Sequence, residues 1–291
     1  ELLPDAPHLV ELPDRGPGAD MIGRTSALLT DLAVDLQPSG WRLVPRAGRD
    51  LRRARDLLDR DLDALAIAAD GYRGPLKLQS AGPWTFAAGV ELPRGDRALS
   101  DRGAVMDLAA SLADGLGAHL QRVRALLPAA TLWVQLDEPS LPAVLAGRVP
   151  TASGFGRLRV PEEPELDAVL ATVLRALPTP GVHCCAADVP LALLRTAGAA
   201  WVSLDATLLR PGRDDDALGE ALDAGTGLVL GIEGDPQPAQ HLLDRLGLAP
   251  DRWRSQVLLT PRCGLAGRSE AAAWELLRAV RSAARQLAEQ D

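Results

Sequence analysis

The residues best suited to chemistry in this chain are one histidine and two cysteines from two short segments. One segment reads Gly-Val-His-Cys-Cys (181–185), and the other reads Pro-Arg-Cys-Gly around Cys263. Alternate side chains of a β-strand share a face, so His183 and Cys185 should point one way and Cys184 the other. With Cys263 they offer one imidazole and two thiolates, a zinc ligand set that lacks one member. Because a zinc ion with an open position activates a thiol or a water, the pattern predicts a catalytic metal site.

A fourth ligand is available from the next β-like segment, Trp-Val-Ser-Leu-Asp, which ends at Asp205. An aspartate in that place also suits a helix cap or an ion pair. Its position in the chain between His183 and Cys263 favours the metal role. A free cysteine is commonly a small core residue, and that is the role expected of Cys184.

Two adjacent carboxylates, Asp137 and Glu138, follow a strongly apolar segment and precede a proline. A carboxylate at a strand end can hold a substrate ammonium group or act as a base. A proline early in a helix also makes this a good helix start, so one of the two can serve as a cap. We expect both in the active site, with Asp137 also binding substrate.

Two further substrate contacts are expected after the preceding β-like segment, at Gln79 and Trp84. Trp84 lies in a Gly-Pro-Trp-Thr segment and could offer a stacking face to a substrate. The same four residues also suit a plain turn between a strand and a helix, so both interpretations stay open.

Short β-like segments alternate with helical patterns of 3.6-residue period, which predicts an α/β fold with a parallel sheet. Seven such segments are visible, and an eighth would close a (β/α)₈ TIM barrel, a fold of roughly 250 residues or more. The missing strand should be the first, because the chain opens with a Pro-rich stretch and a helix. A doubly wound open sheet is the alternative, but no glycine fingerprint follows an early strand. The strands are expected at Val34–Gln37, Leu76–Gln79, Leu132–Leu136, Gly181–Cys185, Trp201–Asp205, Leu228–Ile232 and Val257–Thr260, and the helices at Met21–Leu32, Asp50–Ala69, Ala104–Leu127, Glu165–Leu177, Val189–Ala197, Asp214–Ala224, Pro238–Leu246 and Ser269–Glu289. The candidate site residues all lie at or just after the carboxyl ends of these strands, where barrels build their active sites.

The composition fits a globular chain that we expect to form one domain over residues 1–291. Its 47% hydrophobic content argues against disorder, and its net charge of −8, from 31 basic and 39 acidic residues, argues against nucleic-acid binding. No apolar run is long enough to span a membrane, and the first residues carry no signal-peptide pattern. Three cysteines, two of them adjacent, make a poor disulfide framework and favour a reducing cytoplasm.

Together the motifs resemble those of the catalytic C-terminal barrel of cobalamin-independent methionine synthases. The Asp-Glu-Pro, His-x-Cys and Cys-Gly-Leu motifs are specific as a set, although none would be alone. All the matching segments occur in family order over nearly the whole chain: Asp20–Ile22, Gly82–Thr85, Gln135–Leu141, Val182–Cys185, Val202–Asp205 and Pro261–Leu265.

The resemblance implies zinc-dependent transfer of a methyl group to the thiol of homocysteine, giving methionine. By motif position, Asp137 would hold the amino group of homocysteine. Zinc lowers the pKa of a bound thiol, and the thiolate displaces the methyl group from its donor. The donor would be methyltetrahydrofolate or, as in short single-barrel relatives, a methylated corrinoid protein. The implied zinc ligands are His183, Cys185, Asp205 and Cys263.

The chain also departs from the family pattern. Asp205 stands where the family has a glutamate, and Gly18 and Ala19 stand where it has charged residues. The family's opening strand, with its Gly-Ser-x-Pro turn, and its second N-terminal barrel have no counterpart here. Trp84 is not at the position of the tryptophan that the family uses against the pterin. Two alternatives remain: a metal-free decarboxylase resembling uroporphyrinogen decarboxylase, and a non-catalytic barrel that retains a metal or thiol site.

Overall fold

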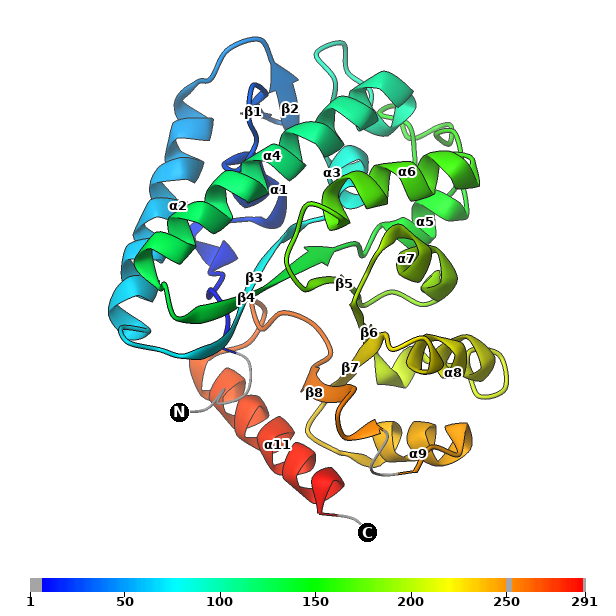
Figure 1. Ribbon diagram of the computed structural model, residues 1–291. Coiled ribbons are helices and arrows are strands. Elements are labelled where there is room, and N and C mark those ends of the chain that lie inside the picture. Colours follow the sequence, from blue (N-terminus) through cyan, green and yellow to red (C-terminus); the bar gives the residue numbers. More distant parts are fainter. Residues whose placement is uncertain (1–6, 250–252, 290–291) are drawn as a thin grey trace.

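A curled parallel sheet organises the protein. A computed structural model describes residues 7–249 and 253–289 (Figure 1). Six strands lie side by side in chain order, so each is joined to the next by a crossover that passes over the outer face of the sheet. The strands are β3 (Gly74–Ala81), β4 (Ala130–Asp137), β5 (Pro180–Cys184), β6 (Trp201–Asp205), β7 (Gly227–Ile232) and β8 (Val257–Pro261).

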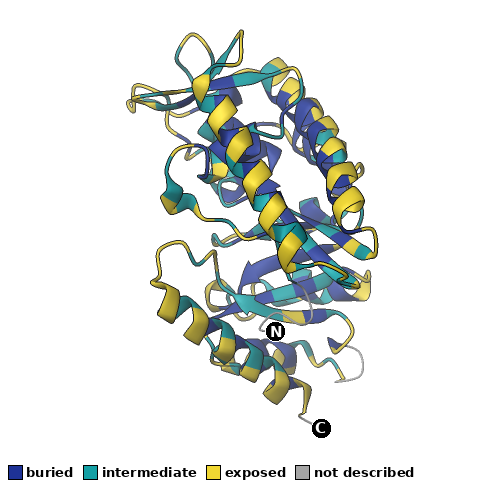
Figure 2. Ribbon diagram, turned by 90° about the vertical axis from the view of Figure 1, so that its left-hand side faces the viewer, coloured by how far each residue is buried: buried dark blue, intermediate teal, exposed yellow. Residues whose placement is uncertain are grey.

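Helices cover the outer face of this sheet, as Figure 1 shows. The outward side chains of the strands are apolar, and Leu76, Leu78, Val134 and Leu136 are each at most 1% exposed. Buried residues gather in the sheet and on the helix faces turned towards it, whereas the outer helix faces are exposed (Figure 2). The covering helices are α4 (Arg102–Leu126), α6 (Glu163–Leu174), α7 (Leu191–Ala197), α8 (Asp215–Asp223), α9 (Gln237–Leu246) and α11 (Glu270–Ala288).

Shorter elements complete the chain. The 20-residue α2 and the 25-residue α4 are the longest helices among the described residues. No helix in the described part of the chain is long and apolar enough to cross a membrane. The remaining elements are α1 (Met21–Ser26), α2 (Arg49–Ala68), α3 (Pro83–Gly89), α5 (Leu141–Leu145) and the 3₁₀ turns η1 (Pro13–Arg15), η2 (Ala98–Ser100) and η3 (Ala206–Leu208).

The first predicted strand does not belong to the parallel sheet. It forms β1 (Ala33–Gln37), which pairs antiparallel with β2 (Gly40–Val44) in a separate hairpin. Gln37 pairs with Gly40, so two residues make the turn, and Gly40 has a φ of +128° that only glycine adopts easily. The prediction of a complete (β/α)₈ barrel is therefore corrected: the sheet is a six-stranded half-barrel.

A short N-terminal segment lies along the free edge of β3. The Lys77 N–H donates to Pro7 O at 2.8 Å, and the Leu9 N–H donates to Lys77 O at 3.0 Å, so the segment runs parallel to β3. The sequence had suggested only a Pro-rich loop here. At the opposite edge, β8 has no strand partner beyond β7 among the described residues. The inner face of the sheet is thus open to solvent on one side, and Leu258 on that face is 37% exposed.

Candidate metal centre

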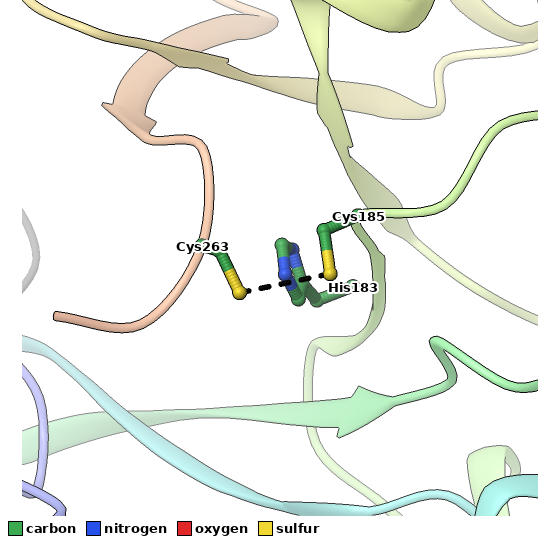
Figure 3. A group of neighbouring side chains, drawn as sticks. All are labelled: His183, Cys185 and Cys263. Carbon is green, nitrogen blue, oxygen red and sulfur yellow. Dashed lines mark hydrogen bonds between the residues drawn. The ribbon is translucent and has the colours of Figure 1, made fainter. Parts of the chain in front are cut away.

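Three of the predicted metal ligands meet at the carboxyl ends of β5 and β8. The ligand atoms of His183, Cys185 and Cys263 all lie within 4.8 Å of one another, and the two sulfurs are 3.6 Å apart (Figure 3). His183 lies on β5, Cys185 follows its last residue, and Cys263 lies in the loop after β8. The curl of the sheet brings these segments together although 78 positions separate the cysteines.

The spacing of these atoms fits a tetrahedral zinc ion. Two sulfurs that each lie 2.3 Å from a tetrahedral zinc are about 3.8 Å apart, close to the distance seen here. His183 and Cys185 are half-buried and Cys263 is exposed, so the cluster lies at the open rim of the sheet. One imidazole and two thiolates leave a fourth position for another ligand or a substrate.

The His183 ring is fixed by Ser203 on the neighbouring strand. The two residues are paired in the register of β5 and β6, and His183 Nδ1 lies 2.9 Å from Ser203 Oγ. This contact leaves Nε2 as the ring nitrogen available to a metal. Metal-binding histidines characteristically have their second nitrogen held in this way. Ser203 was missed as a site residue; its place two residues before Asp205 on the same strand face was the available signal.

The two sulfurs share a hydrogen bond that separates their acidities. This contact and the nearby His183 lower the pKa of Cys263 to about 4, whereas the contact and burial raise the pKa of Cys185. The pair thus holds one thiolate readily, and a bound metal would displace the remaining proton. Cys184 is fully buried on the other face of β5, where burial raises the pKa of its thiol to about 11.

Two tryptophans form the floor beneath the cluster. Trp201 lies beside Gly181 in the register of β5 and β6, and its ring covers that glycine. A Cβ at Gly181 would stand 2.0 Å from the Trp201 ring, so no larger residue fits there. The Trp133 and Trp201 rings lie 6.1 Å apart and tilted by 42°. This aromatic layer fills the inner face below His183 and leaves polar side chains above it.

Asp205 lies at the same rim but outside the three-residue cluster. Its Oδ1 accepts hydrogen bonds from Thr207 N at 2.9 Å and Thr207 Oγ1 at 2.6 Å, which caps η3. Its Oδ2 lies 3.7 Å from Arg262, which also pairs with Glu233 at 2.8 Å. The carboxylate is therefore engaged by the loops around it, and its role as a zinc ligand stays a prediction.

Asp137 lies on the inner face beside His183, its partner in the register of β4 and β5. It is 8% exposed and accepts a hydrogen bond from Gln135 Nε2 at 2.7 Å. Burial raises the pKa of the Asp137 carboxyl, against the opposing charges of His183 and Lys77. A buried carboxylate beside the cluster suits the expected role of binding a substrate cation.

Glu138 has a different place, because its hydrogen bonds hold the first turn of α3. It is fully buried and accepts from Trp84 N at 2.9 Å, Thr85 N at 2.7 Å and Thr85 Oγ1 at 2.8 Å. Burial raises the pKa of this carboxyl to about 7. A Cβ at Gly82 would lie 2.3 Å from Glu138 Oε1, so the approach requires glycine. Of the two roles weighed for this carboxylate pair, Glu138 takes the cap.

The two other expected substrate contacts are occupied within the protein. Trp84 is fully buried in the core, with Nε1 3.4 Å from Leu166 O, so its ring presents no stacking face to a substrate. The plain-turn interpretation of its segment is the one that the structure bears out, since α3 begins at Pro83. Gln79 is buried and donates a hydrogen bond to Leu9 O, which fastens the N-terminal segment to β3.

Two charged residues of this region were missed in the sequence. Glu11 follows the N-terminal segment and lies 3.1 Å from Arg24, and its charge acts on Asp137. Lys77 lies on the inner face of β3, and its charge acts on both Asp137 and Glu11. The sequence suggested that charge near the substrate had been lost at Gly18 and Ala19. Glu11 supplies a carboxylate from a different position.

Comparison with known proteins supports the fold. No family model matches the sequence, and no curated protein matches it. A solved structure of a B12-independent methionine synthase from Shewanella sp. W3-18-1, in complex with selenomethionine, is similar with a TM-score of 0.55 and 11% identity. The similarity covers 85% of this chain and 70% of that one. A Streptomyces plicatus β-hexosaminidase also matches, but its TM-score of 0.29 carries no argument. The chain is thus distantly related in fold to a methionine synthase.

Proposed function

We propose that this protein is a zinc-dependent methyltransferase that transfers a methyl group to the thiol of homocysteine, giving methionine. The observation that carries the proposal is the cluster of His183, Cys185 and Cys263, whose spacing suits one zinc ion. The distant structural similarity to a methionine synthase supports it. The methyl donor is proposed to be methyltetrahydrofolate or a methylated corrinoid protein.

The residues of the chain would divide the work as follows. A zinc ion held by the cluster would supply the charge that keeps a substrate thiol deprotonated at neutral pH. Ser203 holds the His183 ring in one orientation. Asp137 would bind the substrate ammonium group, and its burial strengthens that attraction by lowering the local dielectric. The inner face would hold the acceptor still while the methyl donor approaches from the open rim.

The experiment that tests this proposal is metal analysis of purified variants with an assay of methionine formation. Cys263→Ser should lose most of the zinc and the activity while the protein stays folded. Cys184→Ser is the matched control, since its sulfur faces the other side of β5, and it should keep its zinc. Equal zinc loss in both variants, or a protein that binds no zinc, would contradict the proposal.

A non-catalytic barrel with an inert metal or thiol site is the second candidate. Its support is Asp205, whose carboxylate is engaged by Thr207 and Arg262. Titration with homocysteine separates the two candidates. The methyltransferase should release about one proton for each thiol bound, because the metal binds the thiolate. An inert site should release none. The metal-free decarboxylase is separated by the zinc measurement itself.

A further inference from the structure

Lys77 is the one lysine of this chain, in which the other 30 basic residues are all arginine. Lysine and arginine are not interchangeable: lysine is a compact ammonium with three donors, whereas arginine is a larger planar fork. At every other cationic position the chain uses the larger group. The exception lies on the inner face of β3, in the same charged region as the candidate metal centre.

The backbone around Lys77 is firmly held, which fixes where its side chain starts. Its N–H and C=O both bond to the N-terminal segment, at 2.8 and 3.0 Å. Its neighbours Leu76 and Leu78 are buried on the outer face, so the lysine side chain lies on the inner face with Gln79 and Asp137.

The ammonium group of Lys77 is incompletely satisfied. Nζ donates to Gln79 Oε1 at 3.2 Å. In residues 7–249 and 253–289 no carboxylate oxygen lies within 4.0 Å of it, although Asp137 and Glu11 are near enough for their charges to act on it. Glu11 is paired with Arg24 at 3.1 Å. An ammonium has three donors, so this one retains capacity for an anionic ligand.

We propose that Lys77 binds the carboxylate of an amino-acid substrate whose ammonium group is bound by Asp137, so that the site selects thiols with an α-amino-acid head group. The inference rests on the proposed function, because the thiol of that substrate would lie at the metal cluster. A positive and a negative side chain on one half-buried face match a zwitterion, which brings no net charge into the site. A lysine is small enough to leave room for that ligand where an arginine would fill it.

The single lysine allows a direct test on the metal-free protein, which keeps it independent of zinc chemistry. Reductive methylation with ¹³C-formaldehyde labels only Lys77 and the N-terminal amine, and the latter serves as the internal control. Methionine should slow labelling of Lys77 severalfold, whereas 3-(methylthio)propylamine, which lacks the carboxylate, should not. Equal labelling with and without methionine would overturn the proposal.

A second test exchanges residues against head groups. Cobalt(II)-substituted protein reports thiol binding by its thiolate absorption band. Lys77→Met should weaken homocysteine and 4-mercaptobutanoate about tenfold or more, the loss of one charge-assisted hydrogen bond, and leave 3-aminopropane-1-thiol unchanged. Asp137→Asn should do the opposite, weakening the amine and sparing 4-mercaptobutanoate. Arg52→Met, which removes an exposed charge on α2, is the matched control and should change none of the three.

The outcomes separate this inference from the proposed function. If Lys77→Met weakened all three thiols equally, the lysine would only maintain the shape of the site, and the proposal would be wrong. If cobalt and zinc failed to bind while methionine still protected Lys77, the proposed methyl transfer would be wrong and the amino-acid site would stand.

Discussion

His183 depends on a neutral hydroxyl for its orientation. The 2.9 Å contact between His183 Nδ1 and Ser203 Oγ decides which ring nitrogen faces the two cysteines. Because β6 supplies this hydroxyl directly beside His183 in the sheet register, a small change of side chain can be made without moving the backbone. The metal centre can therefore be tested one step away from its ligands.

We predict that Ser203→Ala lowers zinc affinity by about tenfold to a hundredfold, the usual effect of removing a residue that orients a metal ligand. The ring would lose its fixed tautomer and orientation while all three ligands stay in place. Competition with a chromophoric chelator measures the affinity. Ser203→Thr keeps a hydroxyl and serves as the control. Unchanged affinity in Ser203→Ala would show that packing alone holds the ring.

Glu138 predicts a pH dependence of stability. Its pKa is raised from its ordinary value of 4.5 to about 7 because the carboxyl is fully buried. The folded protein therefore binds this proton more tightly than the unfolded chain, so the contribution is present below pH 4.5 and is lost as the pH rises through 7. Glu138→Gln should lower the melting temperature by removing acceptors from the α3 amides, and should flatten its decline between these pH values. Thermal unfolding across that range measures both effects, and an equal slope in the two proteins would contradict the prediction.

The elements of the half-barrel could be predicted from the sequence because alternation has a simple physical cause. Outward strand residues must be apolar to contact helices, and strand ends carry the polar residues, so β3 to β8 and the three-residue cluster were expected. The β1–β2 hairpin was missed because a short alternating segment does not reveal whether its partner is parallel. Glu11 and Lys77 were missed because their importance depends on the N-terminal segment pairing with β3, a long-range contact. Trp84 was wrongly expected at the substrate because its burial depends on α6 packing over it.

The α4 helix offers a matched pair of glycines for testing how closely it packs. A Cβ at Gly115 would stand 1.8 Å from Leu28 O, a backbone atom that cannot move aside cheaply, whereas a Cβ at Gly117 would meet nothing within 4 Å. Gly115→Ala should destabilise the protein by about 2 kcal/mol or more, the scale of overpacking in a core. Gly117→Ala should stabilise it by about 0.5–1 kcal/mol through helix propensity. Urea unfolding measures both, and similar values for the two would mean that α4 does not approach Leu28 so closely.

At the scale of the whole molecule, the cluster ties together two parts of an open sheet. Cys185 follows β5 and Cys263 follows β8, so a metal would cross-link segments 78 positions apart where the half-barrel is open to solvent. A ligand that binds only the folded state stabilises it by mass action, by about 2.7 kcal/mol at a free concentration one hundred times its dissociation constant. For a chain of this size each kcal/mol moves the melting temperature by roughly 2–4 °C. Removing zinc with a chelator should therefore lower the melting temperature by about 5–10 °C and leave the circular dichroism of the folded protein unchanged, because the core lies in the outer layer between sheet and helices. Cys263→Ser should melt at the same temperature with and without the chelator. A chelated protein that lost its helical signal at room temperature would instead show that the metal is needed to form the fold.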